Sequence, residues 1–374
     1  MWCLRTYIHF LHRYLILKLT QERKLMKKIT IGMAHHTDFH GAYFSIQDII
    51  KELKFNKRKD LLDRLEFVII ENAKENSHAQ AVKNLQSGTG LGDKFRVIDF
   101  PDSQGTSSTR NKIIEEARTD FVLVMDCHVL LCPVVQTLEK LFEFIDRYPN
   151  TMNLYQGPLV YDNLHMISTH FNDEWGGQMW GRWGAAWTCR CKKKNFSIIN
   201  ENNFCKFVEL EKQNKLSYCN HCYTVYPEQI NYAGHENLLH KLDFSRIGFN
   251  ENGSEFEIFS QGLGLFFTSK KSWLGFNEHC RGFGGEECYI HEKYRKAGRK
   301  ALCLPFLKWL HRFARPDGVK YELTVDNKVR NYILEFTELD LDLSPVYKEF
   351  VEEAKFDENK YNELVQEAKS IYGK

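Results

Sequence analysis

The stretch Phe121-Val122-Leu123-Val124-Met125-Asp126-Cys127-His128 joins five consecutive apolar residues to an aspartate and a histidine. A continuous apolar run of this length is typical of a strand that is buried on both faces. Asp126 and His128 follow the run directly, and residues two apart in an extended chain project to the same side. Ligands of open α/β sheets bind beyond the carboxyl ends of the strands. We therefore expect Asp126 and His128 to hold one cation at the end of this strand.

Similar apolar runs precede this one and alternate with segments of helical periodicity. We expect strands at residues 29–33, 66–70, 95–100 and 121–125, and helices between them at 43–53, 79–85 and 110–117. This alternation predicts a parallel, Rossmann-like sheet covered by helices on both faces. A helix at 134–144 and strands near 152–159 and 257–267 follow. The fold class that we expect is α/β.

Length and composition restrict the class of protein. A chain of 374 residues can form one large domain with a satellite. Lys and Arg total 51 against 49 Asp and Glu, so a net charge of +2 gives no general attraction to nucleic acid or to an acidic membrane. Nucleic acid is therefore an unexpected partner. Eleven cysteines without a convincing secretory signal favour reduced thiols or metal ligation, and a cytoplasmic location.

Residues 1–28 form an N-terminal extension with two open interpretations. Their apolar run is interrupted by Arg5, His9, His12 and Arg13, so it is too polar for a spanning helix. The pattern fits a basic amphipathic helix that lies on a membrane surface or on a partner. A loosely held extension ahead of the first strand is the alternative.

Residues 189–253 differ in composition from their surroundings and are rich in Lys, Asn, Cys and His, as expected of an insertion. Four cysteines, Cys189, Cys191, Cys219 and Cys222, form two tight pairs that fit a tetrahedral zinc site. Such a site would supply folding energy to a segment without its own core. Reduced, unligated cysteines are the alternative.

Residues 321–374 form a charged tail with candidate helices at 327–336, 345–354 and 359–371. We expect this tail to be a packing or partner surface.

The order of the motifs resembles the GT-A glycosyltransferases. Two families are most similar: the polypeptide N-acetylgalactosaminyltransferases and, in the second half, the β-1,4-galactosyltransferases. The resemblance covers roughly residues 29–315, and it implies a GT-A domain at 29–320 with a mixed sheet flanked by helices. It is carried by Asp126-x-His128, by Ser272-Trp273-Leu274-Gly275-Phe276, by Arg281-Gly282-Phe283-Gly284-Gly285-Glu286-Glu287 and by His311.

The resemblance implies that His311 joins Asp126 and His128 as a metal ligand. Imidazole with carboxylate suits Mn²⁺ better than Mg²⁺, which prefers oxygen ligands and water. Such an ion would stabilise the diphosphate that leaves when a nucleotide sugar reacts. For a lone histidine among aromatic residues, a hydrogen-bonded core position is the alternative.

Glu286 and Glu287 are the expected catalytic residues. Adjacent carboxylates raise each other's pKa, and sugar transfer to a hydroxyl needs a group that binds the sugar or removes the proton. If the reaction inverts the anomeric centre, the resemblance to the galactosyltransferases implies that Glu287 is the general base and Glu286 a binding carboxylate. If it retains the configuration, no such base is needed. A carboxylate pair favoured by a helix N-terminus is the alternative.

Three residues are expected at the nucleotide by resemblance. His35 lies in the loop after the first strand, and Glu71 ends the second strand beside Asn72, where the families carry a second acid. Arg110 opens the helix before the metal motif and is expected near the diphosphate. The alternatives are surface histidines and an exposed arginine at a helix start.

Trp175 and Trp180 lie in a segment rich in tryptophan and glycine. Indole faces stack on sugar rings, so we expect one of the two to contact the ligand from an acceptor loop. Core packing is the alternative.

Together these features predict a metal-dependent glycosyltransferase. It would move a sugar from a nucleotide sugar, a UDP-sugar by resemblance, to a hydroxyl of a glycan, a protein or a small molecule. Two alternatives remain: a non-catalytic binding protein on the same scaffold, and a nucleotidyltransferase.

Overall fold

The computed structural model describes residues 26–73, 77–162, 167–187, 197–199, 255–314, 318, 321 and 323–374. The amphipathic segment expected before residue 26 lies outside these ranges. The four cysteines of the expected zinc site, Cys189, Cys191, Cys219 and Cys222, also lie outside them. Both features stay predictions.

A sheet of eight strands forms the centre of the molecule, in the order β12-β14-β6-β13-β4-β1-β2-β3. Its first half consists of β1 (Ile29–His35), β2 (Leu65–Glu71), β3 (Phe95–Asp99) and β4 (Phe121–Met125). These four strands are parallel. They are the four strands expected from the apolar runs, and their carboxyl ends meet at one edge.

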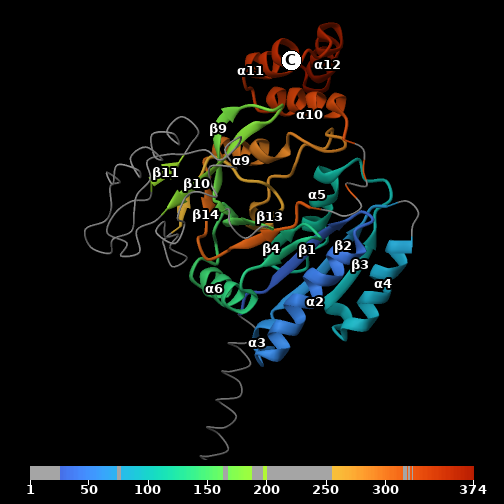
Figure 1. The fold of residues 1–374 in the computed structure, drawn as a ribbon, viewed down its shortest axis with the longest axis vertical. Helices are drawn as coiled ribbons and strands as arrows, with labels where there is room; N and C mark the ends of the chain where they lie inside the picture. The colour runs from blue at the N-terminus through green and yellow to red at the C-terminus, as the bar shows by residue number, and fades with distance from the viewer. Residues whose placement is uncertain are drawn as a thin grey trace, which may run out of the picture.

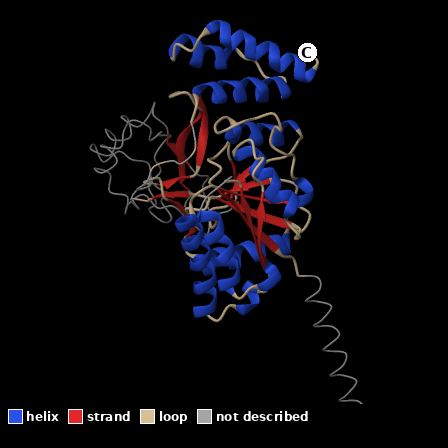
Figure 2. Ribbon diagram, turned by 90° about the vertical axis from the view of Figure 1, so that its right-hand side faces the viewer, coloured by secondary structure: helices blue, strands red, loops and turns tan. Residues whose placement is uncertain are grey.

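Helices cover both faces of this half, and β2 carries apolar side chains on each face. Phe67 and Ile69 of β2 pack in the same core cluster as residues of α2 (Phe39–Phe55), α4 (Ser77–Thr89) and α6 (Val134–Arg147). Val68 and Ile70 pack on the other face with α5 (Thr106–Glu116) and α9 (Glu286–Lys296). Figure 2 shows helices on both sides of the strands. The short helices α3 (Lys59–Leu62) and η1 (Gly92–Lys94) complete this half.

The second half makes the sheet mixed, as expected for a GT-A fold. β13 (Leu265–Ser269) runs antiparallel to β4 and to β6 (Leu154–Gln156). β14 (Ala301–Cys303) runs parallel to β6, and β12 (Phe256–Glu257) is the antiparallel edge. The 3₁₀ helix η2 (Lys270–Ser272) follows β13.

Two of the expected strands are wrong in extent. The segment 152–159 divides between β6 in the large sheet and β7 (Leu159–Tyr161) in a smaller one. The chain changes sheet at Gly157, where a Cβ atom would lie 1.6 Å from the Leu307 carbonyl oxygen. The segment 257–267 likewise divides between β12 and β13.

The smaller sheet has the order β5-β15-β7-β8 and brings distant segments to the strand edge. β5 (Val129–Leu131) follows the metal motif directly, and β15 (Trp309–His311) pairs with it so that His311 faces Val129. β8 (Ile167–Ser168) completes this sheet. Gly264 permits the close approach, because a Cβ atom there would lie 2.8 Å from the Trp309 ring and 3.0 Å from the His311 ring.

The C-terminal helices form a layer at one end of the molecule (Figure 1). They are α10 (Val325–Glu338), α11 (Ser344–Tyr347), the π-helical turn η3 (Lys348–Glu353) and α12 (Glu358–Tyr372). Beside them stands a third sheet made of β9 (His170–Trp175), β10 (Trp180–Trp187) and β11 (Ser197–Ile199). No helix within the described ranges is both long and apolar enough to span a membrane.

Candidate active site

Asp126, His128 and His311 converge at the carboxyl edge of the large sheet. One ligand atom from each of the three side chains lies within 4.8 Å of the other two. The His311 Nε2 atom is 4.0 Å from Asp126 Oδ2, and the two histidine rings lie 4.8 Å apart between centroids, at 87°. The sequence places His311 some 180 residues from the other two; the pairing of β15 with β5 brings it to them.

This donor set fits a divalent transition-metal ion. One carboxylate oxygen and two imidazole nitrogens suit Mn²⁺ or a similar ion. Ligand bonds of about 2.2 Å allow donor atoms on opposite sides of an ion to lie about 4.4 Å apart. The three donor atoms, all within 4.8 Å of one another, lie close to this separation.

Asp38 orients His128. Its Oδ2 atom lies 2.9 Å from His128 Nδ1, and Arg312 approaches its other oxygen at 3.4 Å. Burial alone would raise the pKa of Asp38, but the hydrogen bond and charge of His128 lower it to about 2. A hydrogen bond to Nδ1 leaves Nε2 as the ligand atom of the ring. Asp38 also caps α2, because its side chain accepts a hydrogen bond from the Gly41 amide.

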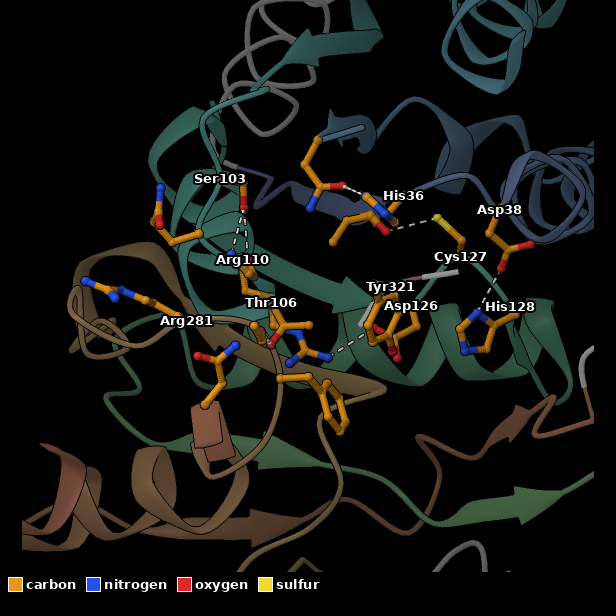
Figure 3. Close-up of a pocket in the computed structure, with 17 residues that line it drawn as sticks. His36, Asp38, Ser103, Thr106, Arg110, Asp126, Cys127, His128, Arg281 and Tyr321 are labelled. Atoms are coloured by element: carbon orange, nitrogen blue, oxygen red, sulfur yellow. Dashed lines mark hydrogen bonds and ion pairs between the residues drawn. The ribbon is translucent and has the colours of Figure 1, made fainter. Parts of the chain in front are cut away.

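Arg110 connects the metal corner, made of Asp126, His128 and His311, to the acidic pair Glu286 and Glu287. Figure 3 shows Arg110 beside Asp126. Its guanidinium donates to Asp126 Oδ1 at 3.1 Å and to Glu286 Oε1 at 3.2 Å. The side chain is 4% exposed, so the alternative of an exposed arginine at a helix start is wrong. Burial would raise the pKa of Asp126, but the charges of Arg110, His128 and His311, with the hydrogen bond from Arg110, together lower it.

Glu286 and Glu287 begin α9, so the helix-start position and a chemical role coexist. Glu286 is buried and accepts hydrogen bonds from Thr106 Oγ1 at 2.8 Å and from the Gly284 amide at 2.9 Å, besides that from Arg110. Burial and then the neighbouring charge of Glu286 raise the pKa of Glu287 to about 7. The two carboxyl groups therefore differ: Glu286 is fixed as an acceptor, whereas Glu287 exchanges a proton near neutral pH.

A cavity of about 440 Å³ opens beside these residues. This volume falls in the range of small-molecule sites. The lining includes Asp126, His128 and Arg110 but not His311, Glu286 or Glu287. Figure 3 shows lining residues that come from segments far apart in the sequence: Ala34, His36, Asp38, Asn72, Ser103, Gln104, Gly105, Thr106, Arg110, Asp126, Cys127, His128, Arg281, Gly282, Phe283, Tyr321 and Asn327.

Two of the residues expected at the nucleotide, His35 and Glu71, are next in sequence to residues that line the cavity. His35 and Glu71 form a buried hydrogen-bonded pair and do not belong to the cavity lining. His36 and Asn72 line it instead, with His36 Nδ1 3.0 Å from Asn72 Oδ1. Because His35 and Glu71 are paired in register across β1 and β2, their side chains project to the same face of the sheet, where both are buried.

The expected ligand contact of Trp175 and Trp180 is not supported by their position. The two indoles stack on each other at 6.0 Å between centroids and pack against Phe336 of α10. Trp180 is buried, and neither ring lines the cavity. Core packing, the alternative interpretation, describes both side chains.

Several lining residues were missed by sequence reasoning, among them Ser103, Gln104 and Asn327. Ser103 and Gln104 lie in the loop before α5, where a run of small polar residues is the available signal. Phe283 belongs to the glycine-rich motif that carries the resemblance, although the sequence assigned it no role. Asn327 lies in the C-terminal tail, and no local pattern distinguishes it.

Comparison with models of protein families identifies the family of this chain. The model of glycosyl transferase family 2 matches residues 45–231, half of the chain. The chain belongs to glycosyl transferase family 2. Its mixed sheet with flanking helices is the GT-A fold. No curated protein sequence matches the chain.

Solved structures of glycosyltransferases are similar to this family 2 chain. GalNAc-T7 with UDP, GalNAc and Mn²⁺ matches with a TM-score of 0.50 and 13% identity, over 92% of this chain and 58% of that one. The mannosyltransferase PcManGT from Pyrobaculum calidifontis, in complex with GDP-Man and Mn²⁺, matches with a TM-score of 0.42 and 10% identity, over 92% and 73%. S. aureus TarS 1-349 in complex with UDP-GlcNAc has a TM-score of 0.26 and 17% identity, over 36% and 35%. These identities bear on the fold alone, and the chain spans 58% of the length of the GalNAc-T7 chain.

Replacing Asp38 with asparagine is expected to weaken metal binding. Asp38→Asn removes the charged partner of His128 but keeps a residue that caps helices well. We expect the dissociation constant for Mn²⁺, measured by electron paramagnetic resonance of the free ion, to rise about 10- to 100-fold. Asp357→Asn is the matched control, because Asp357 caps α12 in the same way. Unchanged affinity in Asp38→Asn, or an equal loss in Asp357→Asn, would contradict the role of Asp38.

The raised pKa of Glu287 predicts that replacing it with a neutral residue stabilises the protein more at high pH than at low pH. Its folded-state pKa of about 7 lies above the ordinary value of 4.5, so the unfolded chain ionises first as the pH rises. The free energy of unfolding therefore falls as the pH rises from about 4.5 to about 7. We expect Glu287→Gln to increase the free energy of unfolding by up to about 3 kcal/mol at about pH 8 and by little at about pH 4, in urea titrations. The exposed Glu363→Gln on α12 serves as the control, and equal effects of Glu287→Gln at both pH values would refute the raised pKa.

Proposed function

We propose that this family 2 chain is a metal-dependent glycosyltransferase that moves a sugar from a nucleotide sugar to a hydroxyl acceptor. The observation that carries the proposal is the convergence of Asp126, His128 and His311 beside the cavity that Arg110 lines. A UDP-sugar and Mn²⁺ are the donor and ion that we propose. The sequence resemblance and the UDP and Mn²⁺ named with GalNAc-T7 support this choice.

Neighbouring side chains hold one atom of Asp126 and one of His128, and this leaves the other atom of each side chain for the metal. Arg110 holds Asp126 Oδ1, which leaves Oδ2 on the side of His311. Asp38 holds His128 Nδ1, which leaves Nε2 for ligation. A divalent ion held there would stabilise the negative charge that develops on the departing diphosphate. The fixed positive charge of Arg110 adds to this stabilisation without reorganising.

The acidic pair supplies the second half of the chemistry. Glu286 keeps both oxygens as hydrogen-bond acceptors, since Thr106 and Arg110 hold Oε1 and the Gly284 amide holds Oε2. Glu287, with its pKa near 7, is the better proton acceptor at neutral pH. In an inverting reaction Glu287 removes the proton of the attacking hydroxyl. In a retaining reaction the same carboxyl binds the sugar or the acceptor.

Donor hydrolysis in the absence of an acceptor tests the proposal. We expect the wild type with Mn²⁺ to release UDP from one of a panel of UDP-sugars, and EDTA to stop the release. His311→Ala should slow it by more than the about 100-fold that loss of an outer hydrogen-bond partner costs a metal site. His40→Ala, which removes an exposed histidine of α2, should leave the rate unchanged.

Each contrary outcome points to another function. Pyrophosphate release from UTP without UDP release from any UDP-sugar would indicate a nucleotidyltransferase. Stabilisation by UDP-sugars in a thermal shift assay without turnover would indicate a binding protein. UDP release that neither EDTA nor His311→Ala affects would exclude the metal-dependent mechanism.

A further inference from the structure

The segment 277–285, which leads into Glu286 and Glu287, lies along one side of helix α10 from the C-terminal tail. Glu338 at the end of α10 accepts a hydrogen bond from Asn277 at 2.8 Å. Arg330 donates to the His279 carbonyl at 2.6 Å. Figure 1 shows α10 between α9 and the outer C-terminal helices. The C-terminal tail therefore contacts the segment that leads into Glu286 and Glu287 directly.

Asn331 makes the densest of these contacts. Its Nδ2 atom donates to the carbonyl oxygens of Arg281 at 2.8 Å and Gly284 at 2.9 Å, and its Oδ1 atom accepts from the Arg281 amide at 2.9 Å. The side chain is 2% exposed, so it does not reach a ligand in the cavity. All three hydrogen bonds hold backbone atoms, and they fix the path of the chain just before α9.

The glycines of the motif follow the surface of α10 closely. Gly284 and Gly285 have φ values of 104° and 107°, which side-chain-bearing residues rarely adopt. A Cβ atom at Gly284 would lie 3.0 Å from Lys328 Cε, and one at Gly285 would lie 2.6 Å from Glu335 Oε2. The segment is thus shaped to α10, and α10 sets its position.

The opposite side of the same segment forms part of the site. Arg281, Gly282 and Phe283 line the cavity. Gly282 also exchanges backbone hydrogen bonds with the start of α5, from the Thr106 amide at 3.0 Å and to the Gln104 carbonyl at 2.7 Å. The segment lies between α5, which carries Arg110, and α10. A shift on the α10 side would move Glu286 and Glu287 relative to Arg110.

We infer that Asn331 is a positioning residue for sugar transfer: through the Arg281 and Gly284 carbonyls it fixes where α9 begins, and with it the two glutamates. The inference rests on the proposed function. The three hydrogen bonds of Asn331 go to the backbone of Arg281 and Gly284, and not to Asp126, His128 or His36, which lie at the proposed metal and nucleotide ends of the site. Loss of Asn331 should therefore affect the chemical step and spare the binding of nucleotide and metal.

The test separates turnover from binding. In Asn331→Ala we expect kcat for UDP release from the UDP-sugar to fall about 10- to 100-fold, as a small displacement of reacting groups does. The dissociation constant for UDP with Mn²⁺, measured by calorimetry, should stay near the wild-type value. Asn331→Ser keeps one donor for a carbonyl, so its kcat should lie between those of the wild type and Asn331→Ala.

Asn111→Ala is the matched control. Asn111 also makes three hydrogen bonds to the connection between β13 and α9, but to Trp273 and Phe276 instead of the glycine-rich part. Its loss should lower stability in urea titrations while kcat stays close to that of the wild type.

Four outcomes would overturn the inference. They are an unchanged kcat in folded Asn331→Ala, a parallel loss of affinity for UDP with Mn²⁺, an equal fall of kcat in Asn111→Ala, and failure of both Asn331 variants to fold, which would assign Asn331 to stability alone. If the wild type releases no UDP from any UDP-sugar, the proposed function fails first and this inference fails with it. An active wild type with an equally active Asn331→Ala overturns only the inference.

Discussion

The buried guanidinium of Arg110 is the interaction on which the site depends. Arg110 is 4% exposed and pairs with both Asp126, directly after β4, and Glu286, at the start of α9, in different halves of the chain. A buried charge is tolerated only when it is paired and hydrogen-bonded, so the two carboxylates and the guanidinium require one another. This pairing ties the metal corner to the acidic motif and fixes the distance between the two chemical functions.

The C-terminal helices contribute residues to the site, which the sequence did not indicate. The tail was expected to be a packing or partner surface, and it does pack: Tyr332 and Phe336 of α10 contact the tryptophans of the β9–β10 hairpin. The same helix also supplies Asn327 to the cavity and Asn331 to the acidic segment. One helix therefore stabilises the hairpin, closes a wall of the cavity and orders the start of α9.

Sequence reasoning succeeded where a pattern has one structural meaning. Strands β1 to β4 were found because continuous apolar runs between helical segments fit a doubly covered sheet. Sequence reasoning failed where a shift of one residue decides which way a side chain points. His35 and Glu71 are buried in the core, whereas the next residues, His36 and Asn72, line the cavity. Trp175 and Trp180 could not be assigned from the sequence either, because tryptophans beside glycines occur both in protein cores and in sugar-binding sites. Asn331 needed the fold, because nothing in the local sequence shows which segment lies against α10.

We propose that one divalent ion binds between Asp126, His128 and His311. The most direct measurement is an anomalous difference map from crystals of the protein grown with Mn²⁺ and UDP. We expect one peak at about 2.2 Å from an Asp126 carboxylate oxygen and from one nitrogen of each histidine. A peak that excludes His311, or an ion bound elsewhere with this trio unligated, would contradict the claim.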